Sequence, residues 1–278
     1  MLTLSQAMQK AQAAGLERLD AQMLLLHVLG RSVHDRAWLL AHDTEVLSEP
    51  SLSAFNDCVQ RRLNGEPLAY ISGHKEFFGL DLQVDARVLV PRPDTETLVE
   101  WALAVLADTP AASVLDLGTG SGAIALALKA SRPDLSVNAI DFSEEALTVA
   151  RSNAARLHLA IDFQHGDWLT SVNHRYRLIV SNPPYVAAQD PHLADLTHEP
   201  LQALSAGIDG LDDLRHIIKQ APAHLEDGGW LLLEHGHDQA VAVRGLLLEA
   251  GFDAIESRRD LSGIDRCSGG CKLASATP

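Results

Sequence analysis

The sequence predicts an α/β protein whose mostly parallel sheet is preceded by a small helical bundle and a hairpin connector. Three observations predict this class. Up to about residue 65 the apolar residues recur at helical spacing. Short apolar runs broken by glycine follow, and after Pro110 strand-like runs alternate with helical stretches. Because strands that alternate with helices pair in parallel and carry the helices on both faces, the last part predicts a doubly wound, Rossmann-like sheet.

Composition and charge narrow the class further. The chain has 278 residues, 46% hydrophobic and 21% charged, which is typical of a globular protein with one large and one small domain. Its formal charge of -15 repels phosphate backbones and disfavours a general grip on DNA or RNA. Three cysteines are too few for a disulfide framework, and no apolar run is long enough for a signal peptide or a membrane span. We therefore expect a cytoplasmic protein.

The first domain is expected over residues 1–67. Apolar residues at turn spacing predict helices within residues 21–29 and 51–63, the second capped by Ser51. Residues 68–92 contain glycine-broken apolar runs such as Phe77-Phe78-Gly79-Leu80, which predict the hairpin connector.

The third part is expected over residues 93–278, and its elements alternate. The rigid segment Pro91-Arg92-Pro93-Asp94 precedes a helix predicted over residues 95–106, with Asp94 as its cap. Ser143 is expected to cap a later helix. Strands are predicted at residues 113–117, 136–140, 161–164, 178–181, 230–234 and 254–257, and helices at 123–131, 144–158, 211–224 and 238–250.

The segment Gly118-Thr119-Gly120-Ser121-Gly122 follows the first of these strands. Three alternate glycines let the backbone turn sharply and approach a ligand without interference from Cβ atoms. With Ala123, the spacing also satisfies the dinucleotide fingerprint, so the motif by itself does not choose between cofactors. A packing turn without a ligand is the alternative interpretation.

Two aspartates bear on that choice. Asp141 ends the second strand, where a carboxylate can accept hydrogen bonds from both ribose hydroxyls of a nucleotide, although it could also merely open the next helix. Asp116 precedes the glycines and adds a carboxylate that a dehydrogenase loop does not need. Because a carboxylate favours a ligand with sulfonium and ammonium charges, the sequence favours S-adenosylmethionine.

The strongest single signal is Asn182-Pro183-Pro184-Tyr185, a rigid turn directly after an apolar strand. Two consecutive prolines remove two N–H donors, so the carbonyls of Asn182 and Pro183 are expected to be free to accept hydrogen bonds. Acceptors on a planar NH2 group, here the Asn182 side-chain oxygen and the Pro183 carbonyl, would align its lone pair and stabilise the charge that develops during methylation. Tyr185 offers a flat face for stacking. Alternatively, the turn only terminates an edge strand.

At these residues the chain resembles a known family. The segments LDLGTGSGAIALAL, SNPPYV, PRPDTE and LLLEHG together resemble the bacterial release factor glutamine methyltransferases of the PrmC/HemK family. The resemblance implies a class I methyltransferase fold of seven strands that uses S-adenosyl-L-methionine. It also implies N5-methylation of the glutamine in the Gly-Gly-Gln motif of class 1 release factors, and an N-terminal domain that helps to dock them.

The resemblance also implies roles for individual residues. Residues 118–122 would hold the methionine part of the cofactor, Asp141 the ribose and Trp168 the adenine region. Residues 182–185 would hold the glutamine amide, with Asn182 also touching the cofactor. Trp168 could equally be a core residue. One departure is the segment 266–272, whose Cys267 and Cys271 stand where strand residues such as Val and Thr are expected.

Competing functions remain open at this point. Methylation of an exocyclic amine on a DNA or RNA base would use the same kind of turn, although the negative charge argues against it. A nucleotide-dependent oxidoreductase would use the same glycine loop, and a non-catalytic module is a third reading. Cys267 and Cys271 lack a second close pair, so we expect no metal, and His235 and His237 beside Glu234 are expected to be structural.

Overall fold

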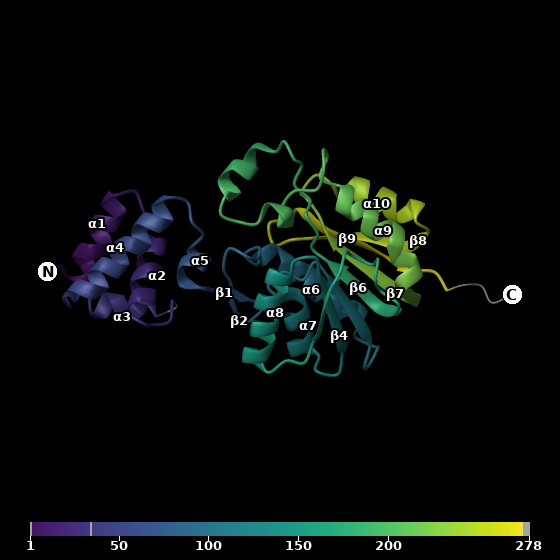
Figure 1. Cartoon of the computed structure of the whole chain (residues 1–278), viewed down its shortest axis with the longest axis horizontal. Helices are drawn as coiled ribbons and strands as arrows, with labels where there is room; N and C mark the ends of the chain where they lie inside the picture. Colours follow the sequence, from purple (N-terminus) through teal and green to yellow (C-terminus); the bar gives the residue numbers. More distant parts are fainter. Residues whose placement is uncertain (1, 34, 275–278) are drawn as a thin grey trace. The chain divides into compact units, whose positions relative to one another are not determined.

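The computed structural model describes residues 2–33 and 35–274 and divides the chain into two compact units, Met1–His74 and Lys75–Pro278 (Figure 1). The first unit is helical. Its core joins side chains such as Leu24, Leu25 and Phe55, all at most 1% exposed. The helices of its described residues are α1 (Leu4–Ala13), α2 (Arg18–Val28), α3 (Arg36–Ala41), α4 (Glu49–Leu63) and α5 (Leu68–Ser72). The predicted N-terminal helical bundle is thus confirmed.

Two sequence predictions in this region are wrong in detail. Helix α4 is capped by Ser48, whose Oγ accepts from the Ser51 backbone N–H at 3.2 Å, so Ser51 is not the cap. Pro50 lies in the first turn, where its missing N–H costs no helical hydrogen bond. Residues 68–72, predicted in the hairpin, form α5 because Tyr70 and Ile71 bury their side chains there. The hairpin is therefore limited to β1 (His74–Phe77) and β2 (Leu80–Gln83).

The second unit is built on a seven-stranded sheet, as far as the described residues extend. Its order is β5-β4-β3-β6-β7-β9-β8, with β5 through β7 parallel and β9 antiparallel to both neighbours. The α/β prediction is confirmed, and β9 covers the segment 266–272 in which the family resemblance implied a strand, although the residues themselves did not predict one there. The strands are β3 (Ser113–Leu117), β4 (Ser136–Asp141), β5 (Asp162–His165), β6 (Tyr176–Ser181), β7 (Leu225–Glu234), β8 (Phe252–Arg259) and β9 (Asp265–Lys272).

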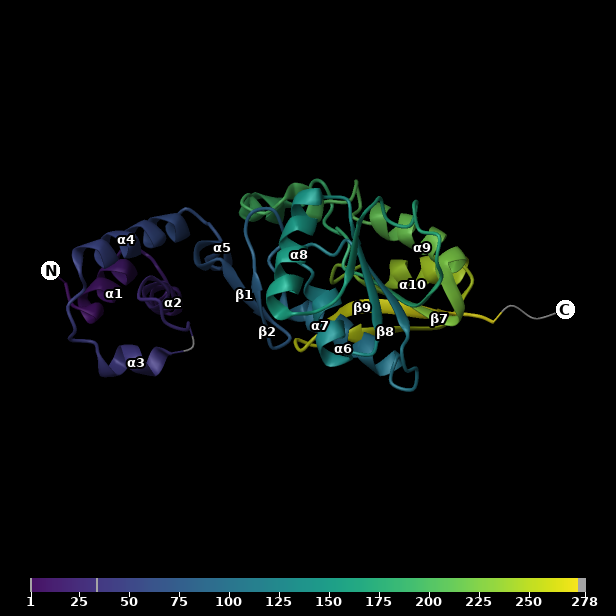
Figure 2. The ribbon, with the colours of Figure 1, turned by 60° about the horizontal axis from the view of Figure 1, so that its bottom comes forward.

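Helices cover both faces of this sheet (Figures 1 and 2). Alternate residues of β3 serve the two faces: Val114 packs into the core with α6 and α7, and Leu115 into the core with α9 and α10. The helices are α6 (Glu96–Val105), α7 (Ala123–Ser131), α8 (Glu144–Leu157), α9 (Asp212–His224) and α10 (Ala240–Glu249). No helix in the described ranges is long and apolar enough to cross a membrane.

The segments that lead into the helices differ from one another. Ser143 caps α8 as predicted, since its Oγ accepts from the Ala146 N–H at 3.1 Å. Asp94 does not cap α6. It lies inside the 3-10 turn η1 (Pro93–Thr95), and the N-cap position of α6 is Thr95, which has helical backbone angles and makes no side-chain capping hydrogen bond. The long loop after β6 contains two further 3-10 turns, η2 (Pro191–Leu196) and η3 (Leu201–Ala203), which the sequence did not predict.

Candidate active site

The glycine loop leaves β3 in a conformation that requires glycine. Gly118, Gly120 and Gly122 have φ values of 67°, 55° and 86°, in the left-handed region that other residues rarely adopt. The N–H groups of Gly118 and Thr119 both donate to the Ile140 carbonyl, at 2.8 and 3.0 Å, and tie the loop to the end of β4. A Cβ on Gly118 would lie 3.2 Å from the Trp168 ring. The loop therefore presents bare backbone.

Asp141 lies where it can serve both predicted roles, ribose binding and opening of the next helix. Its Oδ2 accepts from the Gly120 N–H and its Oδ1 from the Ser143 N–H, both at 2.8 Å. It thus holds the glycine loop against the start of α8, and it also borders the cavity described next. Burial raises its pKa, and the two backbone hydrogen bonds oppose that rise.

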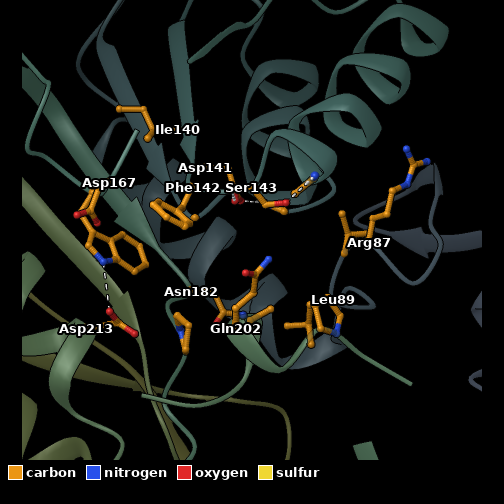
Figure 3. Close-up of a pocket in the computed structure, with 18 of the residues that line it drawn as sticks. Arg87, Leu89, Ile140, Asp141, Phe142, Ser143, Asp167, Asn182, Gln202 and Asp213 are labelled. Atoms are coloured by element: carbon orange, nitrogen blue, oxygen red, sulfur yellow. Dashed lines mark hydrogen bonds between the residues drawn. The ribbon is translucent and has the colours of Figure 1, made fainter. Parts of the chain in front are cut away.

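A cavity of about 390 Å³ lies at the carboxyl ends of β3, β4 and β6 (Figure 3). It brings together several residues singled out in the sequence, which are Gly118, Gly120, Asp141, Trp168, Asn182 and Pro184. It is also lined by residues that the sequence did not indicate, among them Arg87, Leu89, Phe142, Asp167, Gln202 and Asp213. Three of these, Arg87, Leu89 and Gln202, come from loops with no motif of their own, so only the fold brings them here.

The remaining residues of the glycine loop support it from behind. Thr119, Ser121 and Gly122 are absent from the cavity lining formed by the described residues. The Thr119 hydroxyl donates to Asp116 at 2.7 Å, and the same carboxylate accepts from the Ala125 N–H. Asp116 is completely buried, which raises its pKa to about 7. It therefore braces the loop from behind, and in the part of the chain that the structure describes it is absent from the cavity lining.

Trp168 forms a wall of the cavity against the glycine loop. Its backbone has φ of 47°, a rare value for a bulky residue, and its indole N–H donates to Asp213 at 3.2 Å. Burial raises the pKa of Asp213. Because the ring contacts the space above Gly118, the position of Trp168 fits the ligand-contact interpretation as well as the core interpretation.

The Asn182–Tyr185 turn separates this cavity from a second one of about 110 Å³. Asn182 lines both cavities, Pro184 the larger one, and Pro183 and Tyr185 the smaller one. The Asn182 Nδ2 donates to the Thr95 hydroxyl at 3.2 Å, which leaves Oδ1 as the atom available to accept from a ligand. A residue with an available acceptor oxygen, Asn182, thus borders both cavities.

Side chains from distant segments hold this turn. The Tyr185 hydroxyl donates to Glu234 Oε1 at 3.2 Å, and the Tyr185 carbonyl accepts from Gln239 at 3.0 Å. Burial raises the pKa of Tyr185. None of these partners is near Tyr185 in sequence, so no local pattern could have indicated them.

An ion pair between the half-exposed Arg92 and the buried Glu199 fixes the loop beside the smaller cavity. Glu199 accepts from Arg92 at 2.5 Å and from the Val90 N–H at 3.2 Å, and its side chain is 3% exposed. Arg92 itself lines the smaller cavity. Sequence reasoning assigned Arg92 only to a stiff helix entry and gave Glu199 no role, because the pair spans 107 residues.

The histidine and cysteine signals lie elsewhere. His235 is completely buried, and its Nε2 lies 2.8 Å from the Ser268 hydroxyl, a polar contact between β9 and the end of β7. Cys267 and Cys271 are unpaired thiols on β9. Among the described residues, no group of three or more His, Cys, Asp or Glu side chains is arranged to hold a metal ion.

Family models and curated relatives of this chain indicate one family. Residues 95–257 match the family model "Methyltransferase small domain", and residues 3–73 match "PrmC N-terminal domain". A release factor glutamine methyltransferase of Bordetella pertussis is 51% identical over 92% of this chain and 95% of its own length. Another, from Pseudomonas aeruginosa, is 49% identical over 90% of both chains. The crystal structure of a methyltransferase from Pyrococcus furiosus matches 79% of this chain and 100% of its own, with a TM-score of 0.55 and 18% identity, which shows the shared fold.

Proposed function

This chain belongs to the family of release factor glutamine methyltransferases, and from that premise we propose how its residues carry out the reaction. It transfers the methyl group of S-adenosyl-L-methionine to N5, the side-chain amide nitrogen, of the glutamine in the Gly-Gly-Gln motif of class 1 release factors. The observation that carries the residue assignment is that Asn182 borders both cavities and, unlike Leu89 and Ala203, which also do, has a polar side chain. One cavity takes the methyl donor and the other the amide, so the two reactants meet at Asn182.

The larger cavity fits the cofactor. Gly118 and Gly120 offer backbone without Cβ atoms, so residues 118–122 take the methionine part, with the other three residues shaping the loop. Asp141 borders the cavity with a carboxylate that suits ribose hydroxyls, and Trp168 provides a flat wall for the adenine region. When bound, S-adenosylmethionine supplies an electrophilic methyl group.

The turn makes the amide nitrogen reactive. Asn182 Oδ1 and the Pro183 carbonyl each accept one N–H bond of the substrate amide, which directs the nitrogen lone pair toward the methyl donor. The same oxygens stabilise the positive charge that develops on nitrogen, so no strong general base is needed. Pro184 keeps the turn rigid, and Tyr185 stacks on the planar amide and excludes water.

The partner follows from the chemistry and the charge. The substrate is a release factor, and residues 1–67 act as a docking domain for it, joined through the connector at residues 68–92 to the catalytic part at 93–278. A nucleic-acid substrate is disfavoured by the formal charge of -15. Because release factors act in translation, we place the protein in the cytoplasm.

Mass spectrometry tests the proposal directly. Purified protein is incubated with S-adenosylmethionine and a class 1 release factor, and we expect a single methyl group on the glutamine of the Gly-Gly-Gln motif. A release factor in which that glutamine is replaced by alanine is the matched control and should stay unmodified. Duplex DNA and ribosomal RNA are tested in parallel. Methylation of either nucleic acid with none on the release factor would overturn the substrate assignment.

A further inference from the structure

A buried carboxylate lies directly behind the Asn182–Tyr185 turn. Strands β6 and β7 are parallel and pair Ser181 with Leu233, so Asn182 and Glu234 are the next residues on neighbouring strands. On its other side Glu234 pairs with Cys267 of the neighbouring strand β9, and its side chain is 1% exposed. A charge this deep in a sheet is costly unless it has partners, so its contacts indicate why it is there.

The partners of Glu234 belong to the acceptor turn. Its Oε1 accepts from the Tyr185 hydroxyl at 3.2 Å, and the neighbouring Thr95 hydroxyl lowers the pKa of the carboxyl group, which opposes the effect of burial. Thr95 Oγ1 in turn accepts from Asn182 Nδ2 at 3.2 Å. Glu234 Oε2 is buried without a hydrogen-bond partner in the described part of the chain. The carboxylate therefore binds Tyr185 directly, and the Thr95 hydroxyl that accepts from Asn182 is its other polar neighbour in this turn.

The charge state of Glu234 dictates the direction of these hydrogen bonds. An ionised carboxylate only accepts, so the hydroxyls of Thr95 and Tyr185 both donate their protons to it. The Thr95 oxygen can then only accept a hydrogen bond from Asn182, so the Asn182 NH2 group must be the donor. The Asn182 oxygen is consequently the atom that remains for the substrate amide. A neutral side chain at position 234 would remove this constraint.

We propose that Glu234 is a positioning residue for methyl transfer: through the Thr95 hydroxyl it fixes which end of the Asn182 amide faces the substrate, and it fixes Tyr185 directly. This inference rests on the proposed function, since it explains how the acceptor turn is kept in its reactive arrangement. Neither Glu234 nor Thr95 touches the reacting atoms. Their effect is on kcat, because the orientation of Asn182 matters most when charge develops on the amide nitrogen.

The surroundings of Glu234 add a pH dependence. Burial raises its pKa to about 7, opposed by hydrogen bonds from Thr95 and Tyr185 and by the positive charge of Arg266, while Asp94 adds to the rise. Cys267 on β9 pairs with Glu234, and burial and Glu234 raise the pKa of its thiol. Once protonated, Glu234 can donate to Thr95 and free the Thr95 proton for Asn182 Oδ1. Transfer should therefore increase as pH rises through the pKa of Glu234.

The test replaces the charge without changing the shape. Glu234→Gln should lower kcat about 100-fold, the scale expected when a catalytic group is misplaced, with little change in KM for the release factor or in S-adenosylhomocysteine affinity. The increase of kcat with pH near neutrality should disappear. Glu226→Gln, at the exposed beginning of the same strand, is the matched control and should retain the wild-type profile.

A second pair of variants tests the hydroxyl and avoids dependence on one substitution. Thr95→Val keeps the shape but removes the hydroxyl and should lower kcat as Glu234→Gln does, whereas Thr95→Ser keeps the hydroxyl and should restore kcat to within about threefold of wild type. Wild-type kcat and pH profile in Glu234→Gln, or equal kcat in the two Thr95 variants, would overturn the inference. If the wild-type protein itself leaves the release factor unmethylated, the proposed function fails instead.

Discussion

The glycine loop and the Asn182–Tyr185 turn occupy equivalent places at the ends of β3 and β6, but they are held in different ways. The loop is held through its own backbone N–H groups, which donate to the Ile140 carbonyl and, from Gly120, to the Asp141 carboxylate 21 residues away. The turn is held by side chains from Thr95 and Glu234, which are 87 and 49 residues from their partners. The glycine loop, which is the methyl-donor side, should therefore be sensitive to added Cβ atoms. The Asn182–Tyr185 turn, which is the methyl-acceptor side, should be sensitive to the identity of single polar atoms.

The largest effect is expected at Asn182. In Asn182→Ala the substrate amide loses an acceptor whose value is greatest in the transition state, so methyl transfer should fall at least about 100-fold. Affinity for S-adenosylhomocysteine, measured by calorimetry, should change little because the glycine loop is untouched. Asn173→Ala, at an exposed position, is the control. Full activity in Asn182→Ala would break the comparison, since the acceptor side would then not depend on that atom.

A smaller effect, on cofactor affinity and not on kcat, is expected at Gly118. Gly118→Ala places a Cβ in the left-handed region and 3.2 Å from the Trp168 ring, and left-handed backbone alone costs about 1–2 kcal/mol. S-adenosylhomocysteine should bind about tenfold more weakly, while kcat at saturating cofactor stays near wild type.

Gly245→Ala is the matched control for that change. Gly245 lies in α10 with nothing near its added Cβ, so alanine should leave cofactor binding intact and raise stability by up to about 1 kcal/mol. Equal cofactor affinity in the Gly118 and Gly245 variants would contradict the view that the donor side depends on bare backbone.

The same contrast explains what the sequence could predict. Gly118, Asp141 and the cap Ser143 were found because their signals are local: a glycine spacing, a strand end, a residue before a helix. The same holds for the Asn182–Tyr185 turn, because consecutive prolines restrict the backbone whatever surrounds them.

What the sequence missed depends on contacts between distant segments. Glu199 pairs with Arg92 across 107 residues, and Glu234 meets Asn182 only because β6 and β7 pair in one particular register. Asp116 was assigned to the cavity because its place before the glycines is visible in the sequence, whereas its burial is not. Residues 68–72 were misassigned because five apolar-rich residues fit a strand or a helical turn equally well, and burial of Tyr70 and Ile71 decides between them.

The smallest effect on transfer, and the sharpest separation of the two sides, is expected from pH. Asp116 and Glu234 are both buried with pKa values raised to about 7, one behind the loop and one behind the turn. A carboxyl group whose pKa is higher in the folded state than in the unfolded state favours folding at low pH, and this contribution is lost as pH rises to its folded pKa. Asp116→Asn should therefore reduce the loss of stability between about pH 5 and about pH 8 by on the order of 1 kcal/mol relative to wild type, measured by urea unfolding.

The difference from wild type is the quantity to compare, because His27 and His235, with lowered pKa values, contribute the opposite trend in both proteins. Asp116→Asn should still show kcat rising with pH near neutrality, since the loop that Asp116 braces does not orient the substrate amide. In Glu234→Gln the loss of stability with rising pH should also be smaller than in wild type, and kcat should no longer rise with pH. If Asp116→Asn also abolished the pH dependence of kcat, the loop and the turn would not be independent, and the division between a backbone-held donor side and a side-chain-held acceptor side would be wrong.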